Sequence, residues 1–239
     1  MRAATRARRQ RGVSLFVVLV MVMLSCLLVV WASRTALFSE MLTGTDSDYQ
    51  RAFEAAHAMV RDAEFDIMGT RADGKTACKS NAGYVGCREL AGAIFFPNDE
   101  TDFQNLADAL RRASRTCVQG ICIGLGGVGN NKFWESKATL KAMTGIGVAA
   151  TYGAYTGARA TAASNPLLIS GAGQAPQAWY WVEVLPYNLG ANTTAGPAQQ
   201  FAPDGDNPHV YRITAVAQGL KANSLAVVQA LFVRKRVAS

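Results

Sequence analysis

The sequence predicts an α+β fold, in which a long N-terminal helix packs on an antiparallel β-sheet. Three features predict it: an uncharged apolar run near the N-terminus, an apolar stripe at helical spacing after it, and strand-like segments separated by turns towards the C-terminus. The 239 residues are 50% hydrophobic and 17% charged, which excludes a disordered or polyelectrolyte chain.

The formal net charge of +7 comes mostly from one end of the chain. Five arginines and no acidic residue lie in the first twelve residues, which leaves 19 basic and 17 acidic residues in the rest. A body with balanced charge and a basic tip is not a phosphate-binding surface. We therefore expect no nucleic-acid partner, and we interpret the basic end as a targeting signal.

A membrane-spanning helix is predicted next to this basic end. No charged residue occurs from Gly12 to Ser33, and a helix of about 20 residues at ~1.5 Å per residue reaches about 30 Å, the thickness of the hydrocarbon core. A secretory signal peptide would have an apolar region of about 7–15 residues and a cleavage site between small residues, which does not fit this run. The arginines keep the N-terminus in the cytoplasm, so we expect the chain from about residue 34 onward to lie outside it.

The helix is expected to continue beyond the membrane, because the first proline of the chain is Pro97. Residues 43–48 are weak helix formers, and we expect a bend or a frayed turn there. After them, apolar residues recur at spacings of 3 and 4, which predicts one stripe that packs on the sheet: Phe53, Ala56, Val60, Ala63 and Ile67. We expect the charged residues of this segment, Asp62 among them, elsewhere around the helix, and we expect Gly69 to end it.

Three segments near the C-terminus predict an antiparallel meander: residues 178–187, 209–219 and 224–235. They are rich in Val, Ile, Tyr, Trp and Phe, and the segments between them contain the Gly, Pro, Asn and Asp that turns require. The last connection is short enough to form a hairpin. Residues 70–175 show no clear period, and we expect loops, short helices and one extra strand there.

The cysteines predict an oxidised extracytoplasmic part. Cys26 lies in the apolar run, whereas Cys78, Cys87, Cys117 and Cys122 lie where disulfides persist. Four cysteines allow three pairings, of which Cys78–Cys87 and Cys117–Cys122 close the shortest loops. The spacings do not match the usual zinc patterns. We therefore expect two local disulfides and no metal.

The sequence offers no catalytic constellation. The segment GLGGVG at residues 124–129 has the glycine spacing of a dinucleotide-binding loop, but no acidic residue occurs between Glu135 and Glu183 to hold a ribose. Asp204 and Asp206 have a spacing found in calcium loops but lack the further oxygen ligands, so they form only a weak calcium candidate beside a plain turn. We expect no cofactor, no catalytic residue and no enzymatic activity.

The junction from Arg11 to Leu15, a basic leader that ends in glycine before an apolar helix, resembles the class III signal of type IV pilins. The resemblance implies that prepilin peptidase cuts between Gly12 and Val13 and methylates the new N-terminus. Further patches follow the order and rough spacing of PilX-type minor pilins: residues 11–20, 52–64, 117–122, 152–158, 181–185, 211–219 and 226–235. This resemblance implies a type IV pilin-like, disulfide-bonded fold.

One position departs from the pattern of most pilins. Most family members carry Glu at the fifth residue after the cleavage site, and here that residue is Val17. The K-type minor pseudopilins of type II secretion and the PilX-type minor pilins share this lack of Glu. The resemblance therefore implies a tip or initiating subunit instead of a repeating subunit of the fibre.

These predictions divide the chain into five parts. They are a leader at residues 1–12, a membrane or fibre-core helix at 13–33, its continuation at 34–68, a variable loop-rich head region at 69–175 and an antiparallel meander at 176–239.

The resemblance implies a minor pilin that primes or initiates type IV pilus assembly and sits at or near the fibre tip. The implied partners are other minor pilins, the major pilin, prepilin peptidase, the inner-membrane assembly platform and membrane lipid. The implied location is a single pass through the inner membrane with a periplasmic head, and later the pilus fibre at the cell surface. The alternatives are a K-type minor pseudopilin and a membrane-anchored extracytoplasmic sensor or adhesion domain.

Overall fold

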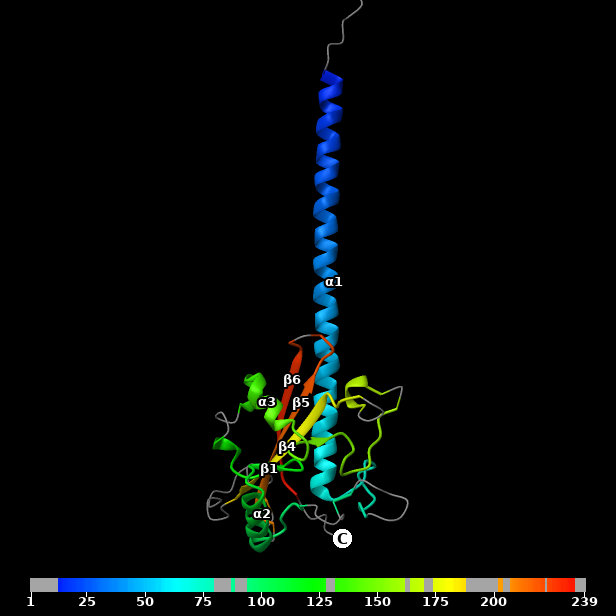
Figure 1. Cartoon of the computed structure of the whole chain (residues 1–239). Coiled ribbons are helices and arrows are strands. Elements are labelled where there is room, and N and C mark those ends of the chain that lie inside the picture. Colours follow the sequence, from blue (N-terminus) through cyan, green and yellow to red (C-terminus); the bar gives the residue numbers. More distant parts are fainter. Residues whose placement is uncertain are drawn as a thin grey trace, which may run out of the picture. The chain divides into compact units, whose positions relative to one another are not determined.

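The computed structural model divides the chain into two compact units, Met1–Ser47 and Asp48–Ser239. We call the second unit the head. The helix α1 (Val13–Met68) contributes residues to both units (Figure 1). The structure describes residues 13–79, 87–88, 94–127, 132–161, 164–169, 174–187, 202–203, 207–221 and 223–234.

In the first unit, α1 carries no charged residue from Val13 to Ser33. Its large apolar side chains from Leu15 to Leu42 are all exposed, and the lowest exposed fraction among them is 37% at Val20. A window of α1 with a mean hydropathy of 3.0 is long and apolar enough to cross a membrane, and none of it is buried. A helix of this composition buries its side chains in lipid or against other chains.

The frayed turn expected at residues 43–48 is wrong, because the structure is helical through this stretch. The Oγ1 atoms of Thr43 and Thr45 donate hydrogen bonds to the carbonyl oxygens of Ser39 and Met41, at 2.8 and 2.9 Å. Because the two hydroxyl groups bond within the helix, they do not draw the backbone into a non-helical conformation.

In the head, the remaining part of α1 buries the predicted stripe. Ala56, Ala63 and Ile67 have no exposed surface and Val60 is 8% exposed, whereas Phe53 is half-buried at the margin of the core. Ala52, Ala55 and Met59 are also fully buried. The buried face is therefore wider than the predicted stripe, and its many alanines let the helix approach the sheet closely.

The head contains one six-stranded sheet with the order β1-β2-β4-β5-β6, in which β3 also pairs with β4. The strands are β1 (Cys117–Val118), β2 (Ile121–Cys122), β3 (Ala150–Thr151), β4 (Ala178–Pro186), β5 (His209–Gln218) and β6 (Leu225–Phe232). The predicted antiparallel meander is confirmed as β4-β5-β6. One pairing differs from the expected antiparallel pattern, since β2 runs parallel to β4. The α+β fold class is confirmed.

The sheet is covered on both faces, as β4 shows. Tyr180 and Val182 belong to the core cluster that contains the buried residues of α1, whereas Trp179 and Trp181 belong to a second cluster with Phe133. Figure 1 shows α1 beside one side of the sheet and α3 (Lys137–Met143) beside the other. Burial on both faces explains why β4 has few polar residues at alternate positions.

The region predicted as loops and short helices also contains α2 (Glu100–Arg112). Asp99 caps its N-terminus by accepting a hydrogen bond from the backbone N–H of Asp102, at 2.8 Å. Leu106 and Leu110 are buried on its inner side. The described residues of this region also form the short 3-10 helices η1 (Leu125–Gly127), η3 (Phe133–Glu135) and η4 (Pro166–Leu168).

The helix α1 ends at Gly69 as predicted. This glycine has a φ angle of +65°, a left-handed conformation that costs glycine little. The N–H of Gly69 donates to the carbonyl of Asp66 at 3.0 Å, and that of Thr70 donates to the carbonyl of Phe65 at 2.9 Å. This pair of bonds is a Schellman motif, which fixes the direction in which the chain leaves the helix.

Candidate functional site

The structure describes some of the residues predicted to matter near the N-terminus, at the cleavage site and at Val17. Gly12 lies outside the described residues, and Val13 is the first residue of α1. Val17 is 48% exposed on the apolar helix and carries no polar atom. Cys26 is an exposed free cysteine on the same helix.

The other four cysteines form two disulfides in the head. They join Cys78 to Cys87 and Cys117 to Cys122, which are the two local pairs expected from the sequence. The calcium candidates Asp204 and Asp206 lie outside the described residues. Within the part of the chain that the structure describes, no group of three His, Cys, Asp or Glu side chains is placed to hold a metal ion.

Three carboxylates of α1 are buried in the head. Asp48, Asp62 and Asp66 are 4%, 2% and 4% exposed, respectively. The expectation that Asp62 lies away from the buried side of the helix is therefore wrong. A buried carboxylate is costly unless it is hydrogen-bonded or paired with a cation, so the partners of these three groups decide how the head is held together.

Asp48 holds the hairpin between β5 and β6. Its two carboxylate oxygens accept hydrogen bonds from the backbone N–H groups of Leu220 and Lys221, each at 3.0 Å. Arg51 lies one helical turn away, with 3.8 Å between its Nη1 and an oxygen of Asp48. Leu220 and Lys221 are 172 and 173 positions from Asp48 along the chain. Their bonds to Asp48 therefore hold the end of the sheet on the helix.

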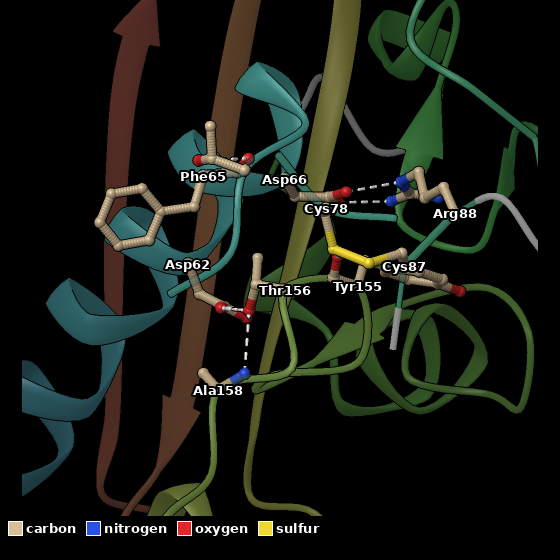
Figure 2. Close-up of a disulfide and its surroundings, with 10 residues drawn as sticks. Asp62, Phe65, Asp66, Cys78, Cys87, Arg88, Tyr155, Thr156 and Ala158 are labelled. Carbon is tan, nitrogen blue, oxygen red and sulfur yellow. Dashed lines mark hydrogen bonds and ion pairs between the residues drawn. A yellow bond between two sulfur atoms is a disulfide. The ribbon is translucent and has the colours of Figure 1, made fainter. Parts of the chain in front are cut away.

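Asp62 holds the turn that follows β3. One oxygen accepts a hydrogen bond from the N–H of Gly153 at 2.8 Å, and the other accepts one from the hydroxyl of Thr156. Figure 2 shows Thr156 between Asp62 and the N–H of Ala158, which donates to the Thr156 hydroxyl at 3.3 Å. Burial raises the pKa of Asp62 to about 6, although its two hydrogen bonds oppose this change.

Asp66 pairs with Arg88 at the end of α1. The Nε and Nη2 atoms of Arg88 donate to the two oxygens of Asp66 at 2.7 and 2.6 Å, and Tyr180 donates its hydroxyl hydrogen to the same carboxylate at 2.7 Å. The side chains of Arg88 and Asp66 are 6% and 1% exposed. Burial lowers the pKa of Arg88, but the charge and hydrogen bonds of Asp66, together with Tyr180 and Tyr155, outweigh it and raise the pKa above its ordinary value. This bidentate geometry is the strongest form of such a pair.

Arg88 also contacts the rings and carbonyl groups around it. Its guanidinium lies 3.8 Å from the ring centroid of Tyr155 and 5.0 Å from that of Phe96. Its N–H groups donate to the carbonyl oxygens of Gln119 at 3.0 Å and Ile94 at 3.3 Å. Arg88 therefore joins α1 to the turn between β1 and β2, which the Cys117–Cys122 disulfide closes.

A further ion pair joins β4 to β5. Glu183, which is 2% exposed, pairs with Arg212 and also accepts a hydrogen bond from the N–H of Leu125 at 2.8 Å. Through this bond, Glu183 fixes the glycine-rich segment at η1 on the sheet. The segment that resembles a dinucleotide-binding loop thus has a structural partner.

A cavity of about 790 Å³ opens beside the Asp66–Arg88 pair. Its walls come from the end of α1, from residues 94–98 and from α2, and they include Lys79, Asp102 and Arg234. Asp66 and Arg88 face this cavity but bond to each other. The charged groups described here therefore fix loops on α1.

Sequence reasoning missed these interactions of the three carboxylates and of Arg88. A weak signal was present, since Asp62 and Asp66 are four residues apart and therefore lie on the same side of the helix. Their partners are far away in the sequence, and nothing in the local pattern identifies Gly153, Thr156 or Arg88.

Comparison with known families gives one finding for the head. Residues 96–234, more than half of the chain, match the family model described as type IV pilus assembly protein PilX, C-terminal part. Comparison with curated proteins and with solved structures gave no match. The matched region begins after α1, so the family match and the pilin-like junction at Gly12 come from separate parts of the chain.

The raised pKa of Asp62 predicts a measurable pH dependence. Between about pH 4 and pH 6 the unfolded chain releases this proton while the head retains it, so the free energy of unfolding falls as the pH rises, by about 3 kcal/mol from this group. We expect Asp62→Asn to lack this part of the decrease. Chemical denaturation of the full chain in detergent at pH 4 and pH 7 measures it.

The matched control is Asp108→Asn, since the Asp108 side chain is 53% exposed. This variant should keep the pH dependence of the unchanged protein. An equal pH dependence in all three proteins would show that Asp62 does not titrate in this range.

Proposed function

This chain belongs to the PilX family of type IV pilus assembly proteins, and we propose that it is a minor pilin that primes or initiates assembly at or near the fibre tip. The family match supports a structural component of the pilus. The proposed priming role depends on one observation, which is Val17 on an exposed apolar helix.

The proposed entry into assembly begins with cleavage between Gly12 and Val13. In this proposal residues 1–12 are the leader, and Val13 becomes a methylated N-terminus. The helix at residues 13–33 then lies in the inner membrane and later in the fibre, and residues 34–68 continue it. The loop-rich part of the head (69–175) and its meander (176–239) lie in the periplasm. The arginines of the leader favour this orientation.

Val17 allows the subunit to be followed by others in the fibre but does not help it to enter beneath another subunit. A subunit that enters beneath another one offers its carboxylate to the N-terminal amine of its predecessor, an attraction that the low dielectric of the membrane strengthens. Val17 has no charge to offer, whereas the amine of Val13 can accept the carboxylate of the next subunit. Others can therefore follow this subunit, and it has no comparable electrostatic means of following them.

The proposed partners are the other minor pilins, the major pilin, the assembly platform, prepilin peptidase and membrane lipid. The apolar side chains from Leu15 to Leu28, which are exposed in this chain, would contact lipid before assembly and neighbouring helices after it. We propose that this chain has no enzymatic activity.

A K-type minor pseudopilin of type II secretion is the second candidate, because those proteins also lack the Glu. Loss of pili in a deletion strain favours the pilus, whereas loss of secretion with normal pili favours the pseudopilin. A membrane-anchored sensor or adhesion domain would keep its leader.

The proposed cleavage predicts the mature N-terminus. Protein isolated from cells with active prepilin peptidase should begin at Val13 with a methylated amine, and protein from cells without the peptidase should retain residues 1–12. N-terminal sequencing and intact mass measure both states. Intact leader on protein from cells with the active peptidase would contradict the proposal.

The role of Val17 predicts that a carboxylate at this position changes incorporation. Val17→Glu should increase the amount of this chain per major pilin in sheared fibres several-fold, because the subunit can then enter beneath others. Quantitative immunoblotting of purified fibres measures this ratio.

Val18→Glu is the matched control, since Val18 is 57% exposed on the same helix and the same charge must enter the membrane. It should not increase incorporation. Equal incorporation of the two variants, or no increase for Val17→Glu, would argue against the one-sided model.

A further inference from the structure

The Cys78–Cys87 disulfide lies directly beside the buried Asp66–Arg88 pair. Figure 2 shows the disulfide between the end of α1 and Arg88, with Tyr155 next to it. Cys87 is 2% exposed and is the covalent neighbour of Arg88. The position of Arg88 therefore depends on where Cys87 is held.

The disulfide also connects Cys87 to the same end of α1 that carries Asp66. The N–H of Cys78 donates to the carbonyl of Gly69 at 2.8 Å, and Gly69 donates to the carbonyl of Asp66 at 3.0 Å. The path from Asp66 through Gly69, Cys78, Cys87 and Arg88 thus returns to Asp66 and forms a closed ring. The disulfide is the link of this ring that reduction can open.

Opening this link changes the loop that the ion pair must close. Arg88 is 22 residues from Asp66 along the chain, whereas the disulfide brings the Cα atoms of Cys78 and Cys87 to 5.5 Å. Closing the longer loop costs more conformational entropy. Both groups of the pair lose their hydration on burial, so the pair forms only while its hydrogen-bonding geometry is held.

We propose that the Cys78–Cys87 disulfide is a redox-controlled latch that seats Arg88 on Asp66. A dithiol reductant opens it: the sulfur–sulfur bond breaks, Cys78 and Cys87 gain two electrons and two protons to become thiols, and the dithiol becomes a disulfide. Arg88 then leaves its buried site, and Asp66 loses its cation. This proposal depends on the contacts within the head and does not depend on the proposed tip position of the subunit.

The effect of the latch is local. Arg88 gives up its bonds to Asp66 and to the carbonyl oxygens of Gln119 and Ile94, so the turn between β1 and β2 loses the hydrogen-bonded link to α1 that runs through Arg88. The Glu183–Arg212 pair joins β4 to β5 and should remain in place. A head that leaves the cytoplasm with reduced cysteines therefore completes this end of its core only after oxidation.

Arginine-selective modification of the full chain in detergent tests the latch. A dicarbonyl reagent is applied during a time course with a dithiol, and mass spectrometry maps modified arginines while thiol alkylation in the same samples dates the opening of each disulfide. Before reduction, Arg88 should react at least about tenfold more slowly than Arg111, whose side chain is 73% exposed. When Cys78–Cys87 opens, Arg88 should approach the rate of Arg111, while Arg212 should keep its own rate.

Two variants repeat the test without reductant. Cys78→Ser with Cys87→Ser should make Arg88 reactive, whereas the matched pair Cys117→Ser with Cys122→Ser should leave it protected. If the first variant does not fold, the time course on the unchanged chain decides. Arg88 that stays protected after Cys78–Cys87 opens, a disulfide that no dithiol opens in the folded head, or Arg88 and Arg212 that become reactive together would each overturn the latch.

Discussion

The head is organised by the need to bury three carboxylates together with the apolar face of α1. Asp48, Asp62 and Asp66 are almost completely buried, and each accepts hydrogen bonds from a different part of the head. The partners are a hairpin, a turn and an arginine, all far from α1 in the sequence. Since an unpaired buried carboxylate is costly, each loop is held at one place on the helix. This constraint gives order to a region with little regular secondary structure.

The sheet and the two disulfide loops also contact the buried carboxylates of α1 or their partners. Residues of β4, β5 and β6 belong to the same core cluster as the buried face of α1, and Tyr180 of β4 also bonds to Asp66. Burial and the nearby charges of Asp66 and Asp62 raise the pKa of Tyr180 well above its ordinary value, so its hydroxyl remains a donor. The two disulfide loops meet at Arg88, through Cys87 on one side and Gln119 on the other.

The sequence predicted the features that depend on local pattern. The stripe on α1, the three long strands and the stop at Gly69 follow from periodicity and turn residues, and the structure contains them. The helix α2 agrees with the short helices expected in residues 70–175, and its N-cap Asp99 and its acidic first turn and basic last turn are readable in the sequence. The parallel pairing of β2 with β4 and the seat of Arg88 were not predictable, because they depend on contacts between residues distant in the sequence.

The position of the subunit in the fibre is the central claim, and immunogold labelling of purified fibres tests it most directly. Antibodies against the head would be applied to sheared, intact pili, with antibodies against the major pilin as the control that decorates the whole shaft. Our account predicts gold at one end of the fibre, because Val17 lets other subunits follow this one but gives it no carboxylate for entering beneath them. Regular decoration along the shaft by the head antibodies would contradict it.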